Sequence, residues 1–182
     1  GGHIHFGTEE LKNTDVTRYV CTLDRILGVA SVSLLGALDN PIRRKFYGLP
    51  GEYRTPPHGL EYRVLSNAWL CHPLAMHLVF DLARGACGVE QAGLSKYWKC
   101  EEDEAIEVIT NNDIKKARKI LDRNKDTFYQ ILKISLNSIG NNNETLYGVW
   151  HNGIDSAVKD VTDIIGNWNI NGGWKTHSGC RP

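Results

Sequence analysis

The sequence has no apolar run of about 18 residues, the length that a membrane-spanning helix requires. It also has no excess charge, because 21 basic residues balance 21 acidic ones, so no global field attracts nucleic acid or anionic lipid. A mean hydropathy of −0.34 and a hydrophobic fraction of 41% are typical of a water-soluble globular protein. We therefore expect no membrane and no nucleic acid as partners, and other partners must be inferred from local sites.

The five cysteines contain no CxxC pair, and their odd number argues against a disulfide framework or a thiolate zinc site. The sequence also lacks a secretory hydrophobic region near its start. Both absences favour the cytoplasm. The first residue is Gly1 rather than Met, and the opening residues have the pattern of a strand, so we expect the sequence to begin inside a fold.

The pattern of apolar residues predicts a mixed fold. After the strand at residues 1–7 we expect a long helix from residue 14 or 15 to residue 38, a turn-rich segment over 43–59 and a strand over 59–65. A helix opened by Pro73 is predicted to run to Arg84 and to stop at Gly85. Helical periodicity then dominates at 105–109, 114–121, 128–136 and 154–165, and the end from residue 166 reads as irregular. The fold class is therefore predicted to be α+β.

The first strand places two imidazoles on one face. Because side chains alternate along a strand, His3 and His5 share one face while Ile4 and Phe6 share the other. Two imidazoles beside glycines can bind a metal ion or a nucleotide phosphate. Taken alone, an HxH pair is more often structural or incidental.

The later strand repeats this arrangement with Glu61 and Arg63. Such a pair is often only a cross-strand ion pair. However, four arginines fall within 21 positions of a segment rich in glycine and proline: Arg43, Arg44, Arg54 and Arg63. Arginine forks bind phosphate and carboxylate oxygens, and phosphoryl transfer uses such a cluster beside a metal-binding carboxylate.

Four segments occur in the order found in one enzyme family: GHIH at 2–5, RRKFYG at 43–48, GEYR at 51–54 and GLEYRVLSNAWL at 59–70. Together they resemble the phage amidoligase-like family, COOH-NH2 ligase-type 2, of the glutamine synthetase and glutamate-cysteine ligase superfamily. The resemblance covers about the first 85 residues. It implies a partial glutamine synthetase-like antiparallel sheet packed by helices: residues 1–100 as the C-terminal half of a ligase catalytic domain, and residues 101–182 as a helical extension.

The resemblance implies a role for each matching residue. His3 and Glu61 would bind a metal ion, expected to be Mg²⁺ or Mn²⁺, and His5 would lie near the nucleotide, ATP. Arg54 and Arg63 would contact the transferred phosphoryl group. A carboxylate substrate or the ATP phosphates would be held by Arg44 or Arg43.

The implied reaction is ATP-dependent formation of an amide through an acyl phosphate, joining a small-molecule or peptide carboxylate to an amine. The family places further metal-binding carboxylates before the GHIH strand. We therefore expect this chain to hold only part of the site. A second copy of the chain in a homo-oligomer is one way to complete it. A phage-encoded ligase would work in the cytoplasm of the infected host.

Two other functions stay open. An HxH strand also opens the barrels of metal-dependent amidohydrolases, although such a barrel typically needs about 250 residues and the arginines would have no role in it. Alternatively, the chain is a non-catalytic phage structural or interaction protein with a ligase-like core.

Overall fold

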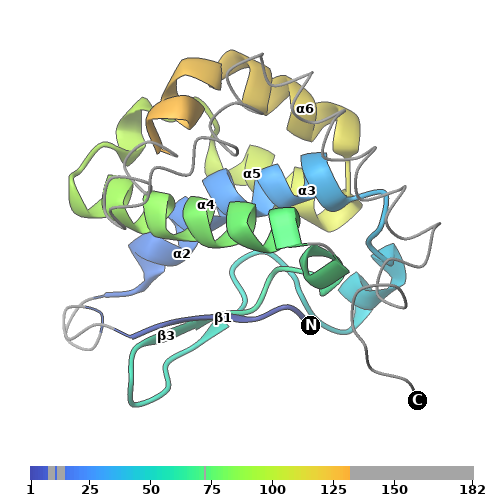
Figure 1. Ribbon diagram of the computed structural model, residues 1–182, viewed down its shortest axis with the longest axis horizontal. Helices are drawn as coiled ribbons and strands as arrows, with labels where there is room; N and C mark the ends of the chain where they lie inside the picture. Colours follow the sequence, from blue (N-terminus) through green and yellow to red (C-terminus); the bar gives the residue numbers. More distant parts are fainter. Residues whose placement is uncertain (8–10, 12–14, 72, 132–182) are drawn as a thin grey trace.

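The computed structural model describes residues 1–7, 11, 15–71 and 73–131, and the side chains of residues 71, 73 and 74 are excluded. Three short strands form one antiparallel sheet in the order β1-β3-β2: β1 (Ile4–Phe6), β3 (Leu60–Tyr62) and β2 (Tyr53–Arg54). The helices lie on one side of this sheet, with α2 and α4 near it and α6 farthest away (Figure 1). This arrangement confirms the predicted α+β class, and the likeness of the sheet to glutamine synthetase stays a prediction.

The core face of the sheet is apolar because alternate residues of β1 and β3 point toward the helices. Ile4 pairs with Tyr62, and both side chains are buried. The pairing of β1 with β3 also requires Gly59, whose φ of 142° suits glycine and where a Cβ atom would lie 2.1 Å from the carbonyl oxygen of Phe6. The strand expected over 59–65 is shorter in the structure, where β3 ends at Tyr62. The residues after β3 still contact the start of the chain, since Gly2 N donates a hydrogen bond to Leu65 O at 3.2 Å.

The long helix expected from residue 14 or 15 is present, but it contains a π-helical segment. It comprises α2 (Thr17–Leu23), η1 (Asp24–Gly28) and α3 (Val29–Leu35), so it ends before residue 38. Asp15 Oδ1 accepts a hydrogen bond from Thr17 N at 2.9 Å at its start. Asp24 is the first residue of η1, and its side chain is buried.

The helix α4 (Pro73–Gln91) does not stop at Gly85 as predicted. Gly85 lies inside it because the helix packs closely on residue 131: a Cβ atom at Gly85 would lie 2.5 Å from Ile131 Cγ2. The glycine that follows the helix end is Gly93, with φ of 65°. Close packing, rather than helix termination, explains this glycine.

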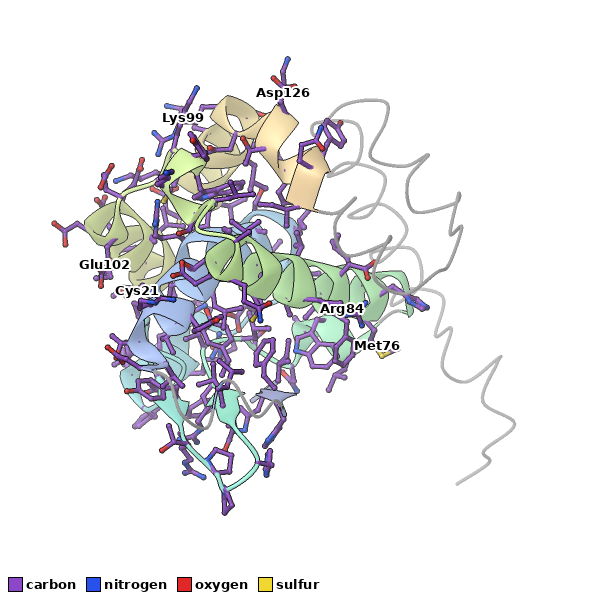
Figure 2. All side chains as sticks on the ribbon, turned by 90° about the vertical axis from the view of Figure 1, so that its left-hand side faces the viewer. Cys21, Met76, Arg84, Lys99, Glu102 and Asp126 are labelled. Carbon is purple, nitrogen blue, oxygen red and sulfur yellow. The ribbon has the colours of Figure 1, made fainter. Side chains whose placement is uncertain are left out.

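Between α4 and the later helices, a loop containing η4 (Ser95–Tyr97) is fixed by Arg25, whose guanidinium donates to three of its carbonyl oxygens. The predicted helical segments at 105–109 and 114–121 correspond to α5 (Glu102–Asn111) and α6 (Ile114–Arg123), and residues 125–131 are helical. Cys21 donates to Glu102 and so joins α2 to α5 (Figure 2).

One hydrophobic core contains residues from β1, the helices and the segment around Phe128. The domain boundary predicted at residue 100 stays a prediction, and the expected features at 132–182 lie outside the described residues. Two 3₁₀ turns complete the described elements: η2 (Pro41–Lys45) and η3 (Ala68–Cys71). In the described part of the chain, no helix combines the length and apolar character needed to cross a bilayer.

Candidate functional site

The candidate site is the polar face of the sheet, opposite the helices. The register places His5 of β1 opposite Glu61 of β3, and Glu61 opposite Arg54 of β2. The carboxylate of the central strand thus has an imidazole on one neighbouring strand and a guanidinium on the other. A carboxylate opposite a guanidinium is a favourable cross-strand pair. His3 and Arg63 extend this row along their strands, so the two faces predicted from the sequence meet in one place.

Glu61 is the centre of this face. Its Oε1 atom lies 2.9 Å from Nδ1 of His3 and 3.3 Å from Nε of Arg63. The carboxylate is buried, whereas His3 and Arg63 are partly exposed. Glu61 therefore lies between an imidazole and a guanidinium, although the buried Nε of Arg63 makes no hydrogen bond to the described residues, and both side chains keep nitrogen atoms that can contact a ligand.

Burial lowers the pKa of His3, and the positive charge of Arg63 lowers it further, although Glu61 acts in the opposite direction. The lowered pKa favours the neutral imidazole of His3 at neutral pH. The contact with Glu61 is then a hydrogen bond in which Nδ1–H donates to the carboxylate, which leaves Nε2 as the nitrogen with a free lone pair. A carboxylate that fixes the tautomer in this way is common around histidine metal ligands.

His5 and Arg54 lie on the exposed part of the polar face. His5 Nδ1 lies 3.1 Å from Nε2 of His58, a residue of the loop that precedes β3. The sequence alone did not associate His58 with the site, because its distance of 53 positions from His5 gives no periodic signal. The antiparallel pairing of β1 and β3 brings the two rings together.

Arg43 and Arg44 are placed differently from the other predicted residues. Both are buried, and both guanidinium groups contact Asp39: Arg43 Nε lies 2.8 Å from Oδ1, and Arg44 Nη2 lies 3.4 Å from Oδ2. Arg43 Nη2 also donates to Val64 O at 2.9 Å, and Arg44 donates to Gly48 O. These contacts attach the turn-rich segment to the end of β3.

The arginine pair retains unused donors. Among the described residues, Arg43 Nη1 and Arg44 Nε are buried nitrogen atoms without a hydrogen-bond partner. Burial lowers the pKa of Arg44, and the neighbouring charge of Arg43 adds to the effect. A ligand role for Arg43 or Arg44 stays a prediction, while their contacts support a role in holding the loop beside the site.

A second group that the sequence reasoning missed lies beneath the sheet. Asp24 of η1 accepts hydrogen bonds from the hydroxyl of Tyr62 and from the backbone N–H of Gly51, each at 2.6 Å. Burial raises the pKa of Asp24 to about 7. The signal was present in the sequence, because Asp24 lies four positions after Val20 and three before Leu27, within the apolar stripe of the helix.

The residues present can supply only part of a metal site. The His3 imidazole and the Glu61 carboxylate are each suitable donors, but Glu61 contacts Nδ1, on the side of the ring away from Nε2, so the two do not face one ion in this arrangement. Mg²⁺ also takes six ligands, mostly oxygen, and usually keeps water and phosphate oxygens among them. No group of three or more His, Cys, Asp or Glu side chains suited to a metal ion occurs in the described residues. These donors therefore fit only part of the ligand shell of such an ion.

A comparison with known protein families identifies one family that matches this chain. The model of the phage phiEco32-like COOH.NH2 ligase-type 2 family matches residues 1–170, well beyond the first 85 residues that carried the resemblance. No curated protein and no solved structure matches the chain. The matched region includes all the strands of the sheet and all the residues of its polar face, and the chain belongs to the phage phiEco32-like COOH.NH2 ligase-type 2 family.

Proposed function

We propose that the polar face of the sheet takes part in ATP-dependent ligation of a carboxylate to an amine. Membership of a carboxylate-amine ligase family supports the general reaction. The observation that carries the finer proposal is the shared contact of Glu61 with His3 and Arg63, in register with His5 and Arg54. This combination of a carboxylate, imidazoles and guanidinium groups is suited to binding a polyphosphate together with a divalent cation.

The reaction has two steps. A carboxylate oxygen of the first substrate attacks the γ-phosphorus of ATP, the bond to the β-phosphate oxygen breaks, and ADP leaves. The amine nitrogen of the second substrate then attacks the acyl carbon, phosphate leaves, and the nitrogen loses a proton to give the amide. We assign Arg54 and Arg63 to the charge on the transferred phosphoryl oxygens, where preorganised donors stabilise the transition state.

His3 and Glu61 would hold the divalent cation, Mg²⁺ or Mn²⁺, which when bound neutralises charge on the phosphate oxygens. His5 would contact the phosphates of the nucleotide. The contacts with Asp39 give Arg43 and Arg44 a supporting role, in which they fix the loop that carries β2. The substrates would be a small-molecule or peptide carboxylate and amine in the cytoplasm of an infected bacterium.

The first experiment measures binding of ATP in the presence of Mg²⁺ to the purified native gene product by isothermal titration calorimetry. The variants Glu61→Gln and Arg63→Ala are expected to weaken binding about tenfold or more, because charge-assisted hydrogen bonds contribute about 1.5–3 kcal/mol. Arg118→Ala is the control, since Arg118 is an exposed arginine of α6, far from the sheet (Figure 1).

The second experiment tests the acyl phosphate. Hydroxylamine replaces the amine, and mixed carboxylates are supplied with ATP. Hydroxamate and ADP are then expected in equal amounts, and only when ATP is present. Absence of ATP binding by the wild-type gene product would favour the non-catalytic alternative, and unchanged hydroxamate formation in both Glu61→Gln and Arg63→Ala would remove these residues from the site.

A further inference from the structure

The loop before β3 carries a histidine that belongs to none of the roles assigned above. His58 Nε2 lies 3.1 Å from Nδ1 of His5, and the two ring centroids are 5.4 Å apart with an angle of 31° between the ring planes. A separation of 3.1 Å between two ring nitrogens requires that one of them carries a proton and the other accepts it. The pair therefore restricts the tautomer of His5.

The backbone holds His58 in this position. Gly59 N donates to Pro56 O at 2.9 Å, which closes a β-turn with Pro57 and His58 as its two central residues. Proline fixes its own φ and so stiffens the turn. The β-turn is joined directly to β3, and β3 pairs with β1, so the ring of His58 is presented to His5 by the same pairing that places His5 opposite Glu61.

When both rings are neutral, two arrangements of the shared proton are possible, with different consequences. If His5 Nδ1–H donates to His58, then His5 Nε2 is a bare nitrogen that accepts a proton or binds a metal ion. If His58 Nε2–H donates instead, then neutral His5 carries its proton on Nε2 and offers a donor to a ligand. A phosphate oxygen is an anionic acceptor and needs a donor, so only the second arrangement suits the contact assigned to His5.

We propose that His58 is a positioning residue for His5: it donates Nε2–H to His5 Nδ1, and so directs Nε2–H of His5 toward a phosphate oxygen of the nucleotide. This inference rests on the proposed function for its ligand, but not for the tautomer. His58 does not touch the reacting atoms in this scheme. It sets the direction and the proton of the ring that does.

The tautomer is tested without any ligand. Nitrogen-15 spectra of the imidazoles, assigned with a His5→Gln variant, report which ring nitrogen of His5 carries the proton. In the wild type and in His58→Gln we expect the Nε2–H form, because the glutamine Nε2 amide reaches the place of the imidazole Nε2. The asparagine of His58→Asn is too short to reach His5 Nδ1, so a mixture of tautomers is expected there. An unchanged His5 signal in His58→Asn would overturn the proposal.

The consequence for the ligand is tested by titration of the same proteins with ATP and Mg²⁺. We expect the dissociation constant to rise about fivefold in His58→Asn, the effect of one ordinary hydrogen bond, and to stay within about twofold in His58→Gln. His77→Gln is the control, since His77 is an exposed histidine of α4. Equal affinity in wild type and His58→Asn would refute the positioning role.

The two measurements also separate the two proposals. If the wild type binds no ATP while its His5 tautomer responds to His58 as described, the proposed function fails and the histidine pair stands without its ligand. If ATP binds but the tautomer does not respond, the proposed function stands and His58 has no positioning role.

Discussion

The buried carboxyl group of Asp24 makes the stability of this fold depend on pH. Its pKa rises from 3.8 to about 7, with burial as the largest cause, opposed by the hydrogen bonds from Tyr62 and Gly51. The folded state therefore holds the proton over a range in which the unfolded chain has lost it. By linkage, this contribution to stability is fully present below about pH 4 and is lost as the pH rises through about 7.

The size of the effect follows from the shift. One pKa unit corresponds to about 1.4 kcal/mol, so a shift of about three units corresponds to roughly 4 kcal/mol in the free energy of unfolding. The substitution Asp24→Asn removes the charge but keeps the shape. The asparagine oxygen accepts from Gly51 N, and the Tyr62 hydroxyl accepts from the amide in place of donating. We expect this variant to match the wild type near pH 4 and to be more stable by up to roughly 4 kcal/mol at pH 8.

The assay is urea unfolding followed by tryptophan fluorescence from pH 4 to pH 8.5, for the wild type and each variant. The difference between Asp24→Asn and wild type isolates Asp24 from all other titrating groups. Asp126→Asn is the control, because Asp126 is exposed at the end of the molecule opposite the sheet (Figure 2), and its curve should run parallel to that of the wild type. If the free energy of unfolding of Asp24→Asn fell with rising pH as steeply as that of the wild type, the reasoning would be refuted.

Two further perturbations test the support of the site. Gly59→Ala should lower the melting temperature much more than Gly51→Ala, although both residues have positive φ. At Gly59 the added Cβ atom would lie 2.1 Å from Phe6 O. At Gly51 the space is open, so only about 1–2 kcal/mol of backbone strain is expected. Equal shifts would contradict this. Asp39→Asn should cost about 3 kcal/mol in urea unfolding, because it leaves two buried guanidinium groups without their carboxylate. Glu107→Gln, which breaks an exposed ion pair with Lys116, should have a much smaller effect. A small loss for Asp39→Asn would show that the buried pair is not needed.

The sequence was sufficient for those parts of the site that depend on strand alternation. The period of two placed His3 with His5 and Glu61 with Arg63, and the structure joins the two pairs through Glu61. Alternation is a local property of the chain, so no knowledge of tertiary contacts was needed.

Features that depend on tertiary contacts were missed or misread. Gly85 was read as a helix end because glycine is common there, but only the packing of α4 on Ile131 explains it. The role of His58 depends on which loop meets β1 after folding, and a separation of 53 positions along the chain carries no information on that. Asp24 is different, because its place in the apolar stripe of the helix is a local signal, although its partners Tyr62 and Gly51 are brought to it only by the tertiary fold.

The antiparallel pairing of β1 with β3 has a consequence for the order of folding. His5 and His58 are separated by 53 positions, and closing a loop of that length costs roughly 3.5 kcal/mol in chain entropy, before any contact across it repays the cost. The long helix that lies between the two strands forms from local contacts and can appear early, whereas the polar face exists only after the strands meet. A ligand of this face therefore recognises the folded tertiary structure, and its binding would report that β1 and β3 have paired.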